Sequence, residues 1–462
     1  MIRRHSFPTA GGVYRPFHSP GKRDKGESYM SSLWSENTVL PAFPALEGDV
    51  STDVLIIGGG MAGLLCALLL KQQGVSYIVA EASRICSGAT KNTTAKITSH
   101  HGLIYSRLLR EKGEEKARMY LTANETALET FRSLCTNWDC DFEEASNFVY
   151  SSGGRQTLEA ETLALRRLGI DAQFHETIPL PFSASAVEFP HQAQFHPLRC
   201  VNAFVQELQI FENTPVRAIE GHTAICSKGR IHAKAIIVAT HFPFLNKHGS
   251  YFLKLYQQRS YVLALSGVEA PKGMFIGDTE NSYSFRRAEG LLLFGGGGHR
   301  TGKPGGNWEL LRKNAAKWYP SAREEYAWSA QDCISLDGLP YIGLYSRRTP
   351  ELYVATGFNK WGMTSSMAAA ILLRDQICGK KNDWAPIFDP SRSMLKPQLF
   401  SNVWEASKNL LTPSPKRCPH MGCALKWNKA EHSWDCPCHG SRFSEKGALI
   451  DNPAVKNLKT RS

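Results

Sequence analysis

The hydrophobic pattern of the chain is clearest between residues 53 and 81. Asp53–Ile57 is a short apolar run rich in β-branched residues, which predicts a parallel strand buried on both faces. A glycine-rich turn follows, and an apolar segment of helical length then runs to Leu70. A second strand, Tyr77–Ala80, ends at Glu81. The order strand, turn, helix, strand predicts an α/β unit with a parallel sheet.

The turn between the first strand and the helix has the spacing G-x-G-x-x-G, in the context where this pattern binds a dinucleotide. Gly58 permits the tight turn, Gly60 lets the backbone approach a pyrophosphate, and Gly63 lets the helix pack closely on the strand. Met61 opens the helix, whose N-terminus faces the phosphates. Glu81 is placed to accept hydrogen bonds from a ribose hydroxyl, and its charge disfavours NADP.

Two further segments bear on whether the dinucleotide is FAD or NAD. Residues 87–94 offer glycine and small hydroxyl side chains soon after Glu81. Far along the chain, the strand Leu352–Phe358 is followed by Trp361–Thr364 and an Ala-rich helix. A second strand-to-helix turn so late in the sequence suits a long ligand that is held at both ends, which favours FAD.

Two other segments, one apolar and one glycine-rich, are interpreted as structural elements and not as functional motifs. Val54–Leu70 approaches the length of a membrane span, but it contains four glycines, so we expect a buried strand, turn and helix and no transmembrane segment. Gly295–Gly298 lacks a following apolar helix and is interpreted as a turn after the strand Leu291–Phe294. Without a second nucleotide motif, an organic substrate fits as the electron donor better than NAD(P)H does.

The N-terminal segment has no periodicity. Residues 1–29 are rich in Gly, Pro and Ser, and either they form a disordered extension or Met30 is the true start; both alternatives stay open. The first 30 residues have basic side chains but no apolar h-region of a secretory signal, so we expect a cytoplasmic protein.

Charge and cysteine content narrow the function classes. The formal net charge is +12, but the Lys and Arg residues are spread along the chain with no long basic run. A basic protein that binds an anionic dinucleotide and an anionic substrate is the simpler interpretation of this charge, and we expect no nucleic-acid partner. Of the twelve cysteines, eight are scattered and expected to be buried or inert, whereas four lie within 21 residues near the C-terminus.

The C-terminal cysteines alternate with histidines in two short motifs. The first is C-x-H-x-G-C from Cys418 to Cys423, and the second is C-x-C-H-G-S from Cys436 to Ser441. Two Cys and two His in short loops can bind zinc. The placement of these residues, however, matches the Rieske proteins, in which two Cys and two His bind a [2Fe–2S] cluster. This resemblance implies a Rieske cluster in this chain.

The resemblance also implies roles for individual residues. Cys418 and Cys436 would ligate one iron, and His420 and His439 the other. It also implies a disulfide between Cys423 and Cys438 that locks the two loops together. Ser441 would donate a hydrogen bond from its hydroxyl to a sulfur, and Asp451–Ala454 would form the proline loop that covers the cluster.

The motif departs from Rieske proteins in two respects. Phe443 stands where many high-potential members have a Tyr, and loss of that hydrogen bond predicts a middling reduction potential. Only a short polar segment, Trp404–Arg417, precedes the first ligand. We therefore expect an abbreviated all-β domain that leans on the flavin domain for its core.

Residues 50–380 resemble the glycine oxidase/D-amino-acid oxidase family of FAD-dependent oxidoreductases. The resemblance rests on the dinucleotide motif, on Gln331–Cys333, on Asp337–Gly343 and on the strand Ile236–Thr240, which closes a small β-meander. It implies that FAD is held by Gly58, Gly60, Met61, Gly63, Glu81, Thr90, Thr93, Thr94, Gly357, Gly362, Met363 and Thr364.

The expected fold is α/β (α+β overall), a Rossmann-like FAD domain with an inserted mixed-sheet substrate domain, followed by the Rieske domain. Residues 1–49 form the N-terminal extension, 50–395 the oxidoreductase and 396–462 the Rieske domain. Within the oxidoreductase, FAD binding is assigned to 50–99, 196–245 and 331–380, and the substrate cap to 100–195 and 246–330.

The two cofactors together predict electron flow from a substrate through FAD and the cluster to an external acceptor, or the reverse. The family resemblance implies an amine or amino acid substrate. Polar residues that could clamp a carboxylate or line the pocket are Arg259, Tyr261, Arg286, His299, Asn359 and Trp361, although each is equally compatible with a surface or packing role. Alternatives are an O₂-using oxidase with a structural or redox-sensing cluster and, less favoured, an oxygenase, for which no domain remains to hold mononuclear iron.

Overall fold

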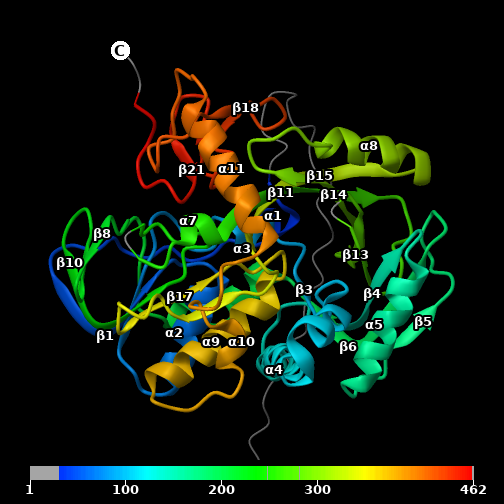
Figure 1. Ribbon diagram of the computed structural model, residues 1–462, viewed down its shortest axis with the longest axis horizontal. Helices are drawn as coiled ribbons and strands as arrows, with labels where there is room; N and C mark the ends of the chain where they lie inside the picture. The colour runs from blue at the N-terminus through cyan, green and yellow to red at the C-terminus, as the bar shows by residue number, and fades with distance from the viewer. Residues whose placement is uncertain (1–30, 247, 280, 460–462) are drawn as a thin grey trace, which may run out of the picture.

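The described residues form three β-sheets, and each sheet belongs to one module (Figure 1). The computed structural model describes residues 31–246, 248–279 and 281–459. The FAD module lies at one end of the long axis, the substrate cap at the other, and the C-terminal domain sits above the cap strands β11 and β15 (Figure 1). The expected architecture is confirmed. The 1–29 segment lies outside the described residues.

The first sheet contains the dinucleotide-binding strands. Its order is β16-β17-β10-β1-β2-β7, and β1 pairs in parallel with both β10 and β2. An antiparallel meander joins β8 and β9 to β10, as expected. The strands are β1 (Val50–Ile57), β2 (Tyr77–Ala80), β7 (Ile210–Phe211), β8 (Ala218–Glu220), β9 (Thr223–Ile225), β10 (Arg230–Val238), β16 (Tyr341–Leu344) and β17 (Leu352–Thr356).

Both faces of β1 are covered, which explains its unbroken apolar run. Val54 and Ile56 pack in the core that holds helices α2 (Met61–Gln72) and α9 (Gly362–Ile377). Leu55 and Ile57 face the meander on the other side. The long helix α4 (Ile104–Cys135), which we assigned to the cap, also packs against α9 and is kinked at Gly113. Smaller helices are α1 (Leu33–Asn37), α3 (Ala89–Asn92), α6 (Pro197–Asn202), η1 (Val205–Glu207) and α10 (Ala385–Phe388).

The second sheet forms the substrate cap in the order β15-β11-β14-β13-β12-β4-β6-β3, with β5 beside β6. All its pairs are antiparallel except β12 with β4, so the sheet is mixed, as predicted. Its elements are β3 (Lys96–Ile97), β4 (Glu143–Ser151), α5 (Arg155–Arg167), β5 (Gln173–His175), β6 (Ser185–Gln194), α7 (Tyr251–Lys254), β11 (Leu255–Ser266), β12 (Met274–Gly277), β13 (Ser284–Ala288), β14 (Leu291–Arg300), α8 (Asn307–Trp318) and β15 (Arg323–Ser335).

The interpretation of Gly295–Gly298 as a turn was wrong. These glycines lie inside β14, which continues to Arg300 and pairs with β11 across an irregularity between Arg259 and Tyr261. Gly297 has φ +62°, and a Cβ there would lie 2.6 Å from the Asn307 carbonyl oxygen. The glycines therefore allow a bulged strand to pass close to its neighbours, a role that sequence pattern does not separate from a turn.

The third sheet is small and antiparallel, in the order β18-β19-β20-β21. The elements of this domain are α11 (Pro397–Leu411), β18 (Lys426–Asn428), β19 (Ser433–Asp435), β20 (Arg442–Ser444) and β21 (Leu449–Asp451). It has a compact core of its own around Leu425, Phe443 and the cysteines. The domain is abbreviated, as expected, and although it has this small core it also leans on its neighbour, through polar contacts and through the rings of Phe242 and Phe252 against His439. Among the described helices, none has both the length and the hydropathy that a membrane crossing needs.

Candidate flavin and cluster sites

A cavity of about 1080 Å³ runs from the glycine turn of β1 to the C-terminal domain. Its size, at the upper end of the range of ligand pockets, suits an extended dinucleotide together with a small substrate. Of the residues predicted to bind FAD, those that line it are Gly58, Gly60, Met61, Glu81, Thr90, Thr93, Thr94, Gly362 and Met363. The lining does not include Gly63, Gly357 or Thr364.

One end of the cavity is the cradle predicted for the ADP half. The hydroxyl of Thr90 accepts a hydrogen bond from the Met61 amide at 3.0 Å, at the first turn of α2. The Glu81 carboxylate accepts bonds from the amides of Gly59 (2.7 Å) and Ser83 (2.9 Å). Burial raises the pKa of Glu81, and these bonds oppose the rise. The carboxylate therefore orders the turn as well as lining the site.

Gly63 contributes to this end of the cavity through packing and not by lining it. A Cβ at this position would lie 1.9 Å from the Gly58 carbonyl oxygen. Only glycine lets α2 approach β1 this closely, which is the packing role predicted from the motif. The first turn of α2, with Met61 and Ala62 on the cavity wall, is therefore placed where the N-terminus of a helix can bind an anionic group.

The N-terminus of α9 closes the other end. Gly362 and Met363 open this helix at the cavity wall, and Trp361 stacks on His101 with ring centroids 4.7 Å apart. Thr364 does not line the cavity. Its hydroxyl accepts a hydrogen bond from the Thr98 amide and donates one to the Thr98 carbonyl oxygen. Two helix N-termini and a wall of side-chain-free glycines meet at one elongated cavity, and this arrangement fits FAD.

The predicted carboxylate clamp is engaged in other contacts. Arg259 donates through Nε and a second nitrogen to the two carboxylate oxygens of Glu431, in the C-terminal domain. The Tyr261 hydroxyl lies 2.9 Å from Glu431 Oε1 and 2.9 Å from His299 Nε2. Arg286 is buried and donates to the carbonyl of Thr94 at 2.6 Å. Burial lowers the pKa of Arg286 to about 9.

Glu431 is the centre of a buried ionic network that sequence reasoning missed. It pairs with Arg259 from β11 and with Arg442 from β20, and Arg442 also pairs with Asp435 and Asp451. Burial alone would raise the pKa of Glu431, but the charges of the two arginines hold it at about 2. The network joins the cap sheet to the Rieske-like domain, and no periodicity in the sequence signals it.

The predicted cluster ligands come together. Cys418 and Cys436 are buried with their sulfurs in contact, and the rings of His420 and His439 lie 4.9 Å apart at 90°. The Nδ1 atoms of both histidines are buried without a partner. Buried acceptors are rarely left unpaired. Two thiols and two unpaired imidazole nitrogens are the donor set of a Rieske [2Fe–2S] cluster, so the residues fit that group.

The other nitrogen of each histidine bonds to a residue outside the C-terminal domain. Nε2 of His420 lies 2.9 Å from Asn246 Oδ1, and His439 bonds the backbone of Phe252. Such outer partners fix the orientation of a ligand ring. The sulfur of Cys418 also receives a bond from Ser441, the predicted hydroxyl donor.

The ligand loops are held by side chains of the cap sheet. Gln257 Nε2 donates to the carbonyls of His439 (2.8 Å) and Asn452 (3.1 Å), and Gln331 Nε2 donates to the Gly440 carbonyl (2.9 Å). Arg300 donates to the Pro437 carbonyl at 3.1 Å. The loops of the cluster site are therefore positioned by the module that also builds the flavin cavity.

Several thiols have neighbours that sequence spacing did not predict. Cys423 and Cys438 are free thiols in contact, so their pairing in a disulfide stays a prediction. Cys135, Cys140 and Cys200, which we expected to be scattered, have their sulfurs within 4.8 Å of one another. They lie in the large apolar core and are small buried side chains there.

Two cavity residues had no signal in the sequence. Burial, with the charge of Arg286, lowers the pKa of Lys96 to about 7, and its Nζ donates to Thr94 Oγ1. His241 also lines the cavity, and its Nε2 is buried without a partner. Lys96 lies in the two-residue strand β3 and His241 in the segment after β10, and only the folded chain brings both to the cavity.

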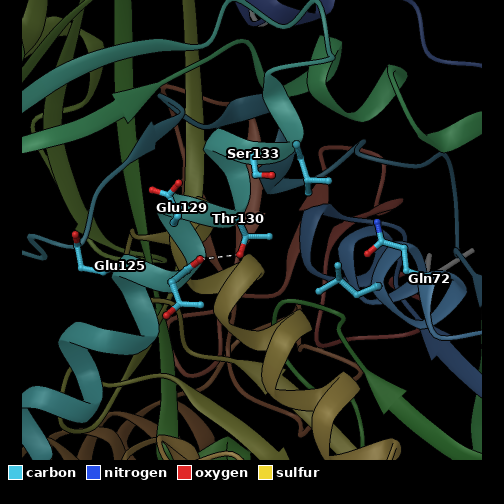
Figure 2. Close-up of a pocket in the computed structure, with 8 residues that line it drawn as sticks. Gln72, Glu125, Glu129, Thr130 and Ser133 are labelled. Atoms are coloured by element: carbon cyan, nitrogen blue, oxygen red, sulfur yellow. Dashed lines mark hydrogen bonds between the residues drawn. The ribbon is translucent and has the colours of Figure 1, made fainter.

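A second hollow of about 660 Å³ lies between α2 and α4 (Figure 2). Figure 2 shows Gln72 facing it from one helix and Glu129, Thr130 and Ser133 from the other. None of the predicted site residues lines it, and we assign no chemistry to it.

Comparison with known proteins identifies both modules. Residues 53–376 match the family described as FAD dependent oxidoreductase, and residues 398–462 match the Rieske [2Fe-2S] domain. The chain is 34% identical to the putative Rieske 2Fe-2S iron-sulfur protein YhfW of Bacillus subtilis (strain 168), over 93% of this chain and 97% of that protein. It is 25% identical to gamma-glutamylputrescine oxidoreductase of Escherichia coli (strain K12), over 75% and 88%.

Among solved structures, glycine oxidase from Geobacillus kaustophilus superimposes with a TM-score of 0.63 at 20% identity, over 74% of this chain and 99% of that chain. The first family match covers more than half of the present chain, and the second covers the domain that holds the Cys and His ligands. The chain therefore belongs to the family described as FAD dependent oxidoreductase, and it carries a Rieske [2Fe-2S] domain at its C-terminal end.

Proposed function

We propose that the protein oxidises an amine or amino acid and delivers the electrons, one at a time, through its own cluster to an external acceptor. Removal of a hydride from the carbon next to nitrogen, with a proton from nitrogen, leaves an imine and releases two electrons. Bound FAD supplies a two-electron acceptor that can also release electrons singly, and the cluster supplies a one-electron relay. Both electrons then leave the protein in two single transfers.

The observation that carries this proposal is the continuity of the flavin cavity with the C-terminal domain. The same cavity is lined by Gly58 and Met61 at the dinucleotide turn and by Asp451, Asn452 and Ala454 beside the ligand loops. A cluster with a purely structural role would need no such shared wall. The polar bonds across the interface also favour a domain that stays docked during turnover.

Several residues of the chain have roles in this proposal. Trp361, stacked on His101, would form the wall against which a substrate is positioned. Lys96, with its pKa near 7, would accept the proton from the substrate nitrogen. The Arg259–Glu431 pair would hold the cap strand and the C-terminal domain together.

The test compares the wild-type protein with Cys436→Ala, which removes a cluster ligand. With a panel of amines and amino acids and without oxygen, both proteins should show bleaching of the flavin absorption by the substrate. Only the wild type should reduce cytochrome c at a rate comparable to that of flavin bleaching, because only the wild type retains the one-electron relay. Cys226→Ala, a buried thiol in the β-meander, is the matched control and should behave as the wild type does.

Oxygen consumption separates the alternative function. An oxidase with a structural or sensing cluster would consume O₂ at the same rate in both proteins and would reduce cytochrome c equally poorly. That result, or flavin bleaching with no reduced cluster signal in electron paramagnetic resonance, would overturn the proposal.

A further inference from the structure

Helix α11 presents an unusual surface. The described residues include twelve strongly exposed large apolar side chains, and six of them lie on α11 or just before it: Leu395, Phe400, Val403, Trp404, Leu410 and Leu411. Phe400 is 70% exposed, Trp404 69% and Leu411 83%. The spacing of residues 400, 403, 404 and 411 places them along one side of the helix. We call this side the outer face of α11; the helix lies across the front in Figure 1.

The helix is held in this orientation by its polar side. Asn402 donates to the Leu253 carbonyl at 3.0 Å, Glu405 pairs with Lys303, and the Asn409 carbonyl accepts from the Ala424 amide at 2.9 Å. All three residues are buried. An amphipathic helix normally buries its apolar side. Here the specific polar contacts fix the opposite arrangement, so the outer face needs an apolar partner.

The charges of this domain indicate what that partner is. Residues 396–462 contain eleven Lys and Arg against five Asp and Glu, which is half of the net charge of the protein. Four of the five acidic residues are drawn into ion pairs, since Glu405 pairs with Lys303 and the other three with Arg442. The surface around the helix is therefore basic.

Basic residues also lie on the helix and just beyond its two ends. Lys396 precedes the helix, Lys408 is exposed on it, and Lys416 and Arg417 follow it. Within the described residues, none of these four takes part in an ion pair, although Lys416 lies over the Trp434 ring and Arg417 bonds backbone carbonyls. A face of Trp, Phe and Leu side chains, flanked by Lys and Arg residues that have no ion-pair partner among the described residues, is typical of a helix that lies in the surface of an anionic bilayer.

We propose that the outer face of α11 docks the protein on an anionic lipid bilayer. Phe400, Trp404 and Leu411 enter the boundary between head groups and acyl chains, and the lysines contact the anionic head groups. An acidic protein partner fits less well, since docking of that kind uses charge and needs no row of exposed aromatic and aliphatic side chains.

The docking surface lies next to the cluster site. Asn402 accepts a hydrogen bond from Arg300, which in turn donates to the carbonyl of Pro437, between Cys436 and Cys438. The Cys438 thiol lies 3.9 Å from the Glu405 carbonyl oxygen. The bilayer surface would therefore lie close to the ligand loops. The inference does not depend on the proposed direction of electron flow.

The experiment is sedimentation of the full-length, cofactor-loaded protein with lipid vesicles. Vesicles of phosphatidylcholine with phosphatidylglycerol should bind the wild type, and vesicles of phosphatidylcholine alone should bind it much less. The double variant Phe400→Ser/Trp404→Ser should lose at least about tenfold in affinity, since two aromatic side chains would no longer be buried in the bilayer. Lys408→Glu should lose several-fold more in low salt than in high salt.

Leu163→Ser is the matched control, because Leu163 is 66% exposed on α5, outside this domain. It should bind vesicles as the wild type does, and the flavin and cluster absorption of every variant should be unchanged. Failure of the wild type to bind anionic vesicles would overturn the proposal, as would equal binding to neutral vesicles or an equal loss in Leu163→Ser. A wild-type dimer that becomes monomeric in the double variant and does not bind vesicles would assign the face to a second copy of the chain.

Discussion

The flavin cavity and the cluster site are built in different ways from the same chain. The cavity owes its shape to the backbone, through glycines at close contacts and the N-termini of α2 and α9. The cluster site takes its four ligands from residues 418–439, but its loops are held by side chains of β11, β14 and β15. Local motifs thus specify what each site binds, whereas long-range side-chain contacts specify how the two sites are joined.

A large loss of FAD binding is expected where backbone packing leaves no room for a side chain. Gly63→Ala would place a Cβ 1.9 Å from the Gly58 carbonyl oxygen, so α2 must move away from β1. We expect the FAD content per chain, measured from absorption, to fall at least about tenfold, in line with an overpacking cost of about 1–3 kcal/mol or more. The cluster should persist, because the side chains that hold its loops lie on β11, β14 and β15 and not on α2 or β1.

Gly153→Ala is the control for this substitution, since a Cβ there meets no atom within 4 Å. Normal FAD content in Gly63→Ala would contradict a cavity shaped by backbone contact.

The C-terminal domain should be destabilised most by loss of Arg442, the cation that its Glu431, Asp435 and Asp451 carboxylates share. Arg442→Met leaves Asp435 and Asp451 buried or half-buried without their partner. Breaking such a network costs about 3–5 kcal/mol. The cluster absorption should therefore disappear at a lower urea concentration, while the flavin is retained. Arg312→Met removes an exposed pair with Glu324 and should cost at most about 1 kcal/mol; equal effects would contradict a special role of the buried network.

Acidification tests the same network through Glu431. Its pKa of about 2 lies below the value of about 4.3 for an unfolded glutamate, so its contribution to stability is present above that value. The contribution, about 3 kcal/mol, is lost as the pH falls from about 4 to about 2. The difference in urea midpoint between the wild type and Glu431→Gln should be constant from pH 5 to 7 and shrink below pH 4. A difference that grows on acidification would contradict the network.

A smaller effect is expected from a single amide. Gln257→Leu removes the donor to the carbonyls of His439 and Asn452, at a cost of about 1–3 kcal/mol for the unpaired groups. The cluster should be released faster by a chelator than in the wild type. Gln398→Leu, which loses a bond only to Asn402, is the control. An unchanged rate of cluster release in Gln257→Leu would show that the ligand loops keep their conformation without this side chain.

The sequence could predict the features that depend on neighbouring residues, but not those that depend on contacts between distant parts of the chain. The order of apolar run, glycines and Glu81 predicted β1, α2 and β2, and the Cys and His spacing predicted the cluster ligands, because each depends on neighbours in the chain. The glycines of β14 were misread, since a bulge and a turn require the same conformational freedom. The partners of Arg259 could not be predicted, because Glu431 lies 172 residues away and shares no pattern with it.

The proposed function depends above all on electron transfer from the flavin to the cluster within one chain. The most direct measurement mixes the anaerobic protein with a reducing substrate, freezes samples over time, and follows the reduced cluster by electron paramagnetic resonance at several protein concentrations. We predict that the cluster is reduced after the flavin, with a first-order rate that does not change with protein concentration. A rate proportional to protein concentration, or a cluster that stays oxidised while the flavin is fully reduced, would contradict the account.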